Sequence, residues 1–300
     1  MASLTVGKKN LEWGVCTYVM GVLNITPDSF SGDGLLPPPS SPISTGNGGG
    51  AGLEQARRFL ASGADILDVG GESTRPGSQP VSADEELARV LPVIRAIAEE
   101  LPDAIISVDT YKAAVAEEAL KSGAHLVNDV WGLRADPDLS RVVASLRSAV
   151  ILMHNRSSPA SVEVRERLGS AYIGPEYKNL LEDVKHELMK SVAIARAAGI
   201  PDDRIILDPG IGFGKTVEQN LELVDRLGEI RAMGFPVLFG PSRKSFIGYT
   251  LDLPPDQRVE GTAAAAAVGI ARGADIIRVH DVEYMARVAR MTDAIVRRKT

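Results

Sequence analysis

Side chains that could bind or transform a small molecule follow the short apolar runs of this 300-residue chain at regular intervals. They stand at or shortly after the points where strands are expected to end: Asn24, Thr74, Arg75, Asp109, Asn128, Asp129, His154, Asp208, Ser242, Lys244, Arg278 and His280. A single aspartate in such a place often only caps the next helix. Buried strands that repeatedly end in charged or amide groups would lose stability unless those groups meet a ligand. The pattern therefore predicts a binding site where the strand ends converge.

The types of these side chains indicate what they bind. Carboxylate and amide groups suit the N–H edge of a planar heterocycle, and three residues offer them: Asp109, Asn128 and Asp208. Cationic and imidazole donors suit phosphate or carboxylate oxygens, and four residues supply them: Arg75, Lys244, Arg278 and His280. Asn24 adds a neutral oxygen, which is adequate for Mg²⁺ when water and phosphate fill its other positions. The sequence has no His/Cys/Asp cluster at zinc spacing and no justifiable Ser–His–acid arrangement, so neither an all-protein metal cage nor a hydrolase triad is expected.

The glycine-rich stretch DPGIGFGKT, Asp208–Thr216, resembles a phosphate-binding P-loop but does not match it. Pro209 stands where that motif requires its first glycine. The stretch also fails G-x-G-x-x-G, because Lys215 occupies the last glycine position. We interpret it as a turn that lets a flat ligand approach the backbone, with Phe213 available to pack.

Apolar and amphipathic runs alternate along the whole chain and predict eight strand–helix units. The expected strands are 15–23, 64–70, 104–108, 125–127, 149–153, 204–207, 236–239 and 275–279. The expected helices are 52–62, 82–100, 111–122, 137–146, 176–198, 217–233, 261–272 and one from about 282. Three joins repeat a glycine before a buried strand: SGADILDV, SGAHLVND and RGADIIRV. Eight such units favour an α/β fold of the (β/α)8 TIM-barrel type, with an open doubly wound sheet as the alternative.

We expect residues 1–300 to form a single domain with a short N-terminal extension. Two stretches interrupt the rhythm. Residues 31–52 are rich in proline and glycine and predict a long loop after the first strand, and residues 155–175 follow the fifth strand. In a barrel both lie on the face that carries active sites, a position that suits a lid role for the first.

Composition excludes several classes of protein. With 44% hydrophobic and 24% charged residues the chain can bury a core and is not disordered. The net charge of −6 argues against a broad nucleic-acid surface. The absence of a long apolar run or a signal-type N-terminus predicts a soluble, cytoplasmic protein without a membrane partner. One cysteine, Cys16, is expected in the core of the first strand.

Eight segments together resemble the dihydropteroate synthase family of pterin-binding barrels. They are MGVLNITPDSFSGDG, DVGGESTRPG, SVDT, VNDV, LMH, DPGIGFGK, PSRKSFIG and RVHDV, in that order and over almost the whole chain. The resemblance implies a (β/α)8 barrel that acts as a homodimer in folate biosynthesis. It also implies the Mg²⁺-dependent condensation of 6-hydroxymethyl-7,8-dihydropterin diphosphate with 4-aminobenzoate, which gives 7,8-dihydropteroate and diphosphate. Sulfonamides are the expected inhibitors.

The resemblance also implies roles for individual residues. The pterin is expected to contact Asp109, Asn128, Asp208, Lys244, Met153 and Phe213. The diphosphate is assigned to Asn24, Thr74, Arg278 and His280, with Asn24 also at the Mg²⁺. The aminobenzoate site is assigned to Arg75, Pro76, Ser242 and Phe213, and catalysis to Lys244, Arg278 and Asp28. The family mechanism is SN1-like: diphosphate leaves, a pterin-methyl cation forms, and the aniline nitrogen attacks it.

Two other functions remain open from the sequence. A pterin-dependent methyltransferase barrel would share the pterin residues but lack the SRK and RVH anion-binding sets that stand here. A non-catalytic pterin-binding paralogue would need neither Asn24 nor Arg278 nor His280. The first loop also departs from the family, because Gly32 and Asp33 are exchanged and the proline- and glycine-rich insertion follows. This departure affects the expected lid and leaves the expected pocket unchanged.

Overall fold

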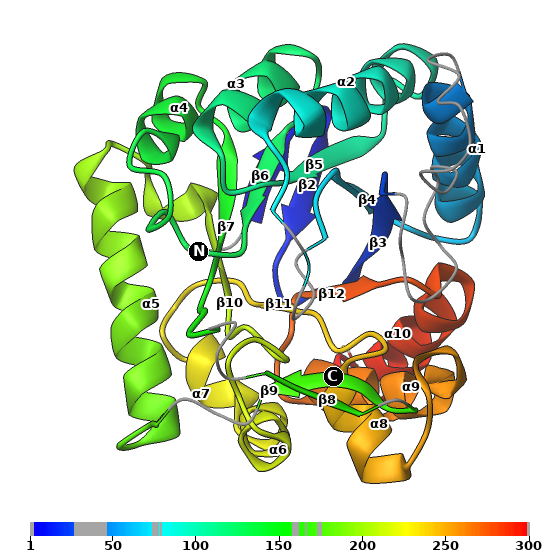
Figure 1. Cartoon of the computed structure of the whole chain (residues 1–300), viewed down its shortest axis with the longest axis vertical. Helices are drawn as coiled ribbons and strands as arrows, with labels where there is room; N and C mark the ends of the chain where they lie inside the picture. The colour runs from blue at the N-terminus through cyan, green and yellow to red at the C-terminus, as the bar shows by residue number, and fades with distance from the viewer. Residues whose placement is uncertain are drawn as a thin grey trace.

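Eight parallel strands form a closed barrel at the centre of the molecule (Figure 1). The computed structural model describes residues 3–26, 47–73, 78, 80–157, 162–165, 167–172 and 176–298. The barrel strands are β3 (Tyr18–Asn24), β4 (Ile66–Gly70), β5 (Ile105–Asp109), β6 (Leu126–Asp129), β7 (Ala149–Met153), β10 (Ile205–Asp208), β11 (Leu238–Phe239) and β12 (Ile276–Val279). Their order is β10-β7-β6-β5-β4-β3-β12-β11, and a parallel bridge between Leu207 and Val237 joins the two ends. The (β/α)8 barrel is confirmed, and the open sheet is excluded.

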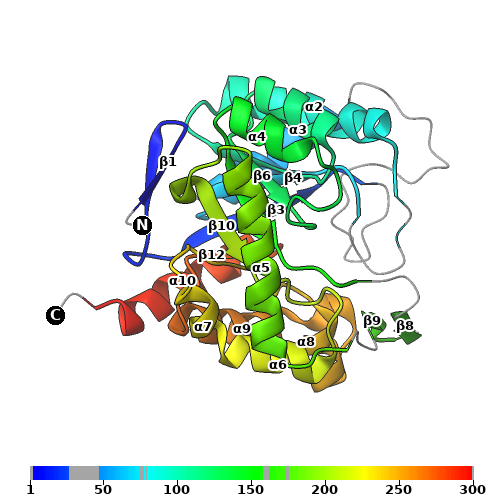
Figure 2. The same cartoon turned by 90° about the vertical axis from the view of Figure 1, so that its left-hand side faces the viewer.

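The helices surround this barrel and return the chain from one strand to the next (Figures 1 and 2). They are α1 (Asn47–Ala61), α2 (Ala83–Glu100), α3 (Ala113–Lys121), α4 (Leu139–Ser145), α5 (Leu180–Ala197), α6 (Val217–Asp225), α7 (Leu227–Arg231), α8 (Ser245–Leu251), α9 (Val259–Ala271) and α10 (Val282–Val296). Short 3₁₀ turns occur at Asp202–Arg204 and Pro255–Gln257. Within the described ranges, no helix is both long and apolar enough to cross a membrane.

The prediction of a loop over residues 31–52 is wrong at its C-terminal end, because residues 47–52 already belong to α1. Glycine weakens a helix by about 1 kcal/mol relative to alanine, which is why this run reads as a loop. Tertiary packing overrides that preference: a Cβ on Gly52 would lie 2.7 Å from Cγ1 of Val93, so glycine lets α1 approach α2 closely. Residues 27–46, which include Asp28, lie outside the described residues.

Other element boundaries also differ from the sequence expectation. The first barrel strand begins at Tyr18 rather than at residue 15, so Cys16 precedes it and is only partly buried. The expected helix 217–233 is divided between α6 and α7 at Arg226. The stretch 155–175 contains an antiparallel pair, β8 (Val162–Arg165) and β9 (Gly169–Tyr172).

The N-terminal extension is an antiparallel hairpin that covers one end of the barrel. It consists of β1 (Ser3–Val6) and β2 (Lys9–Glu12), and Figure 2 shows β1 at the opposite end from β8 and β9. Three of its side chains, together with Trp13 directly after β2, pack against the apolar side chains at this end of the barrel interior: Leu4, Val6 and Leu11. Burying this apolar surface stabilises the fold by about 25 cal/mol for each Å² removed from water.

The interior of the barrel changes from apolar to polar between one inward-facing residue of a strand and the next, two positions further along. The hairpin contacts an apolar layer to which Met20, Ile66, Ile105, Leu126, Ile151, Ile206, Leu238 and Ile276 contribute. Side chains two positions further along a strand point to the same face. In six of the strands those positions hold Asp68, Ser107, Asn128, Met153, Asp208 and Arg278. The strand alternation therefore places polar groups directly above the apolar layer.

Candidate active site

Arg278 lies between two buried carboxylates at the centre of this polar layer. Its Nε is 2.6 Å from Oδ2 of Asp68, and its Nη2 is 2.6 Å from Oδ2 of Asp109. Asn128 donates from Nδ2 to the same oxygen of Asp68 at 3.1 Å. One guanidinium thus holds two carboxylates that would otherwise repel each other.

Both carboxylates keep an oxygen for a ligand. Within the part of the chain that the structure describes, Oδ1 of Asp68 and Oδ1 of Asp109 are buried and accept no hydrogen bond. A buried acceptor without a donor costs about 1–3 kcal/mol, so such oxygens call for a partner. Burial raises the pKa of Asp109 to about 7, although the positive charge of Arg278 opposes the rise. These oxygens suit the N–H groups of a bound heterocycle.

Asp208 provides a third buried carboxylate at the end of β10. Its Oδ1 accepts a hydrogen bond from the backbone N–H of Gly210 at 2.7 Å. Burial raises the pKa of Asp208 to about 6, against the Gly210 hydrogen bond and the positive charges of Lys244, Lys215 and Arg278. The carboxyl is therefore mostly ionised at pH 7 and takes up a proton as the pH falls through about 6.

An apolar wall stands beside these acceptors. Met153 and Phe213 are 3% and 8% exposed and pack with Val130, and Tyr111 and Trp131 border the cluster. The ammonium of Lys244 lies 4.0 Å from the ring centroid of Phe213, within cation–π range. A flat ring can contact this wall while its edge meets the carboxylates.

Ser242 and His280 form a second group, between the ends of the seventh and eighth strands. Ser242 Oγ accepts a hydrogen bond from the backbone N–H of His280 at 3.2 Å and lies 3.0 Å from its Nδ1. Arg243 holds both oxygens of Asp281, at 2.9 and 2.6 Å. The Ser242 hydroxyl thus orients His280. The predicted contact of Ser242 with an aminobenzoate stays a prediction.

The predicted site residues are largely brought together. Asp109, Asn128 and Arg278 meet through Asp68, and Asp208 and Met153 lie in the same polar layer. Asn24 ends β3 in register with Gly70, which pairs with Asp109. Thr74, Arg75 and Pro76, like Asp28, lie outside the described residues.

Asp68 is a residue that the sequence interpretation missed. The sequence predicts that the run ADILDVG is a buried strand, and the predicted site residues follow its end. The available signal was a charge two positions after the inward-facing Ile66 of that apolar run. A carboxylate there must be paired or functional, because an unpaired buried charge is too costly.

Asn24 is the protein oxygen that the sequence offers for a divalent cation. Among the described residues, no group of three or more His, Cys, Asp and Glu could hold a metal ion. A neutral amide at the mouth fits Mg²⁺ that takes most of its ligands from water and from phosphate oxygens.

Comparisons with known proteins agree with this geometry. A family model described as "Pterin binding enzyme" matches residues 20–280. A dihydropteroate synthase of Clostridium beijerinckii is 46% identical over 98% of this chain and 100% of its own. The chain belongs to the dihydropteroate synthase family. A structure of the Clostridium difficile dihydropteroate synthase in the presence of pteroic acid has a TM-score of 0.83, with 45% identity over 95% of this chain and 99% of its own.

A second structure of the dihydropteroate synthase family, from Yersinia pestis with a sulfonamide drug, has a TM-score of 0.85. It is 39% identical and covers 98% of each chain. The predicted family, the barrel and the dihydropteroate synthase activity are thus confirmed, and the chain is a transferase of folate synthesis.

Proposed function

We propose that the pocket around Arg278 condenses 6-hydroxymethyl-7,8-dihydropterin diphosphate with 4-aminobenzoate, through the residues described above. The observation that carries this assignment is the pair of unpartnered buried oxygens on Asp68 and Asp109, held beside one guanidinium. The oxygens accept the N–H edge of the pterin, together with Asn128 and Asp208. The ring lies against Met153 and Phe213, with Lys244 at its oxygen side.

The same residues support departure of the diphosphate. Arg278 and His280 neutralise the leaving group, while the carboxylates of Asp109 and Asp208 stabilise positive charge on the pterin methylene. The carbon–oxygen bond to the diphosphate breaks, the aniline nitrogen bonds to the methylene, and that nitrogen then loses a proton. The reaction needs no protein nucleophile. Mg²⁺ bound near Asn24 would supply further charge for the diphosphate oxygens.

The aminobenzoate site borders Phe213 and Ser242 and includes Arg75 and Pro76. Asp28 and Thr74 complete the predicted set, on the segments that follow β3 and β4. The Yersinia pestis relative with its sulfonamide drug supports sulfonamides as inhibitors of this chain as well.

We further propose a cytoplasmic homodimer in which residues 1–300 form a single domain. Support for the dimer comes from α10, where Tyr284, Met291 and Ile295 are 58%, 63% and 54% exposed. Val268 on neighbouring α9 is 43% exposed. Light scattering that gives the monomer mass at micromolar concentration would contradict the dimer.

Turnover by the purified chain tests the proposed function. Given dihydropterin diphosphate, 4-aminobenzoate and Mg²⁺, the chain should release diphosphate and form dihydropteroate in equal amounts. Pterin binding without product would favour the non-catalytic binder. Transfer of a methyl group from methyltetrahydrofolate would favour the methyltransferase.

Pterin affinity should fall as the pH is lowered from 8 to 5. The pKa values of Asp109 and Asp208 are raised to about 7 and about 6 by burial. Below those values the carboxyls take up protons and lose acceptor strength for N–H groups. Titration calorimetry with 6-hydroxymethylpterin, which carries no diphosphate, measures the effect without titration of the leaving group. An affinity that is constant across this range would remove both carboxylates from the pterin site.

A further inference from the structure

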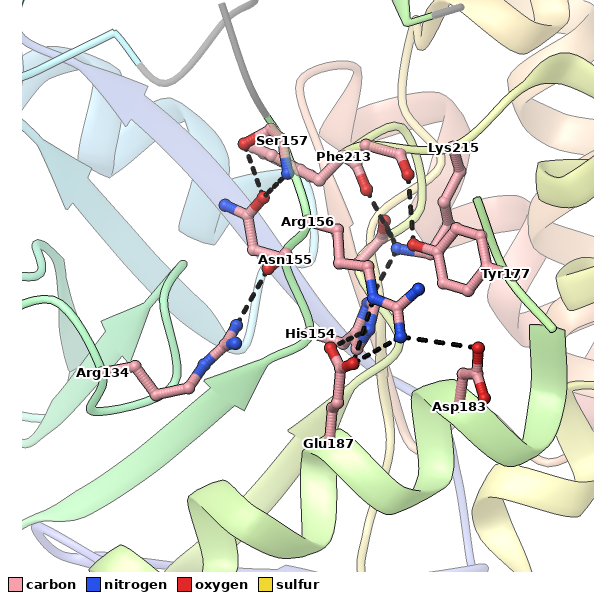
Figure 3. Close-up of polar contacts among 12 residues, drawn as sticks. Arg134, His154, Asn155, Arg156, Ser157, Tyr177, Asp183, Glu187, Phe213 and Lys215 are labelled. Carbon is pink, nitrogen blue, oxygen red and sulfur yellow. Dashed lines mark hydrogen bonds and ion pairs between the residues drawn. The ribbon is translucent and has the colours of Figure 1, made fainter. Parts of the chain in front are cut away.

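A chain of polar side chains joins the glycine-rich loop 209–215 to α5 and to the segment after β7 (Figure 3). At its centre is Lys215, which is 2% exposed. Its ammonium donates to the carbonyl oxygen of Gly210 at 2.9 Å and to that of Phe213 at 3.0 Å. Its Nζ also lies 3.0 Å from Nδ1 of His154. Burial lowers the pKa of Lys215 to about 7. In the protonated form all three protons of the ammonium have an acceptor, which leaves none for a phosphate.

His154 connects Lys215 to a carboxylate on α5. Its Nε2 is 3.0 Å from Oε2 of Glu187. Burial lowers the pKa of His154 to about 4, so the ring is neutral at pH 7. The ring then accepts from the Lys215 ammonium at Nδ1 and donates from Nε2 to Glu187, a tautomer assigned from its partners.

Glu187 also fixes a second contact with the loop. Its Oε1 accepts from Nε of Arg156 at 3.0 Å, and the Arg156 guanidinium lies 4.2 Å from the ring centroid of Tyr177. The Tyr177 hydroxyl donates to the carbonyl of Gly214 at 3.1 Å. Carbonyls at three positions of the loop are thus held by one network that includes Glu187.

The loop has little room to take another path. Gly210 adopts a φ of +72°, and a Cβ there would lie 1.8 Å from the carbonyl oxygen of His154. The backbone N–H of His154 donates to the carbonyl of Asp208 at 2.9 Å. The network therefore adjoins a loop that begins at the carboxylate of Asp208 and carries the ring of Phe213.

We infer that Lys215 is a positioning residue of the pterin site. Its hydrogen bonds fix the carbonyls of Gly210 and Phe213. The fixed backbone in turn orients the ring of Phe213, which the Lys244 ammonium contacts. His154 and Glu187 hold Lys215 in place. This inference rests on the proposed pterin-binding role of Phe213, and Lys215 itself does not touch the substrate.

Lys215→Met tests the inference, because it keeps the length of the side chain and removes its donors. The KM for dihydropterin diphosphate should rise about tenfold or more, as expected for loss of hydrogen bonds from a charged donor. The value of kcat should change by less than about threefold, because the loop contacts the pterin equally in the ground and transition states. A purely structural role predicts the opposite, since a smaller folded fraction lowers apparent kcat and leaves KM unchanged. Lys185→Met is the matched control, because Lys185 lies on α5 in an exposed ion pair with Glu182 at 2.7 Å.

A double-mutant cycle with Phe213→Leu identifies the route of the effect. If Lys215 acts through Phe213, the double variant should raise KM no more than the larger single effect. Additive effects, or an unchanged KM in Lys215→Met, would overturn the inference. If Phe213→Leu alone leaves KM unchanged, the proposed pterin-binding role of Phe213 fails, and the inference fails with it. Should Lys215→Met not fold, Glu187→Ala removes the more distant support of the network, and an unchanged KM in that variant overturns the inference.

Discussion

Arg278→Met should lower kcat/KM for dihydropterin diphosphate by about 1,000-fold, the scale found when a main electrostatic donor is lost from an active site. The change removes the group proposed to neutralise the leaving diphosphate. It also leaves Asp68 and Asp109 facing each other, because both now bond to this guanidinium at 2.6 Å. The measurement is steady-state release of diphosphate together with the melting temperature.

Two further variants separate catalysis from folding in this experiment. Arg278→Lys retains a positive charge between the carboxylates but cannot bond both in the forked arrangement of a guanidinium, so the fold should survive while activity stays low. Arg272→Met is the matched control, because Arg272 pairs with Asp225 at the surface and should leave kinetics unchanged. A wild-type value of kcat/KM in Arg278→Lys would show that catalysis does not need the forked geometry of the guanidinium.

Lys244→Ala should reduce kcat/KM by about 100-fold without loss of the fold. The side chain contacts the ring of Phe213 and precedes α8 without making a cap hydrogen bond, so the helix does not depend on it. Circular dichroism and the melting temperature should match those of wild type. Lys190→Ala, at an exposed position of α5, is the control. Unchanged kinetics in Lys244→Ala would remove this residue from the site.

The sequence predicted the barrel and most of the site for one physical reason. In parallel strands that are covered by helices, the chemistry collects at the carboxyl ends, so Asp109, Asn128 and Asp208 could be located by finding where each strand stops. Asp68 escaped that rule because it lies within a strand. Its role depends on Arg278, which is 210 residues away in the chain.

Features that depend on tertiary packing could not be predicted in the same way. The first turn of α1 contains three consecutive glycines, and the close packing against α2 that Gly52 allows beside Val93 cannot be read from the sequence. The network of Lys215 was equally hidden. Glu187, which joins this network through His154, lies in the middle of α5, where a carboxylate is typical of an ordinary solvent-facing position.

The join between β10 and β11 gives the barrel one weak seam. β11 has two residues, and a single bridge between Leu207 and Val237 closes the ring, whereas β3 and β4 pair at five positions. Local opening should begin at this seam, so the Leu207 amide, which donates to the carbonyl of Pro236, should exchange with deuterium earlier than the amides of β4. Local opening there would separate Asp208 from Lys244, while the ion pairs of Arg278 with Asp68 and Asp109 would stay formed. The two sides of the pocket would then differ in rigidity: the side with Asp68, Asp109 and Arg278 would be preformed, and the side with Asp208 and Lys244 would be adaptable.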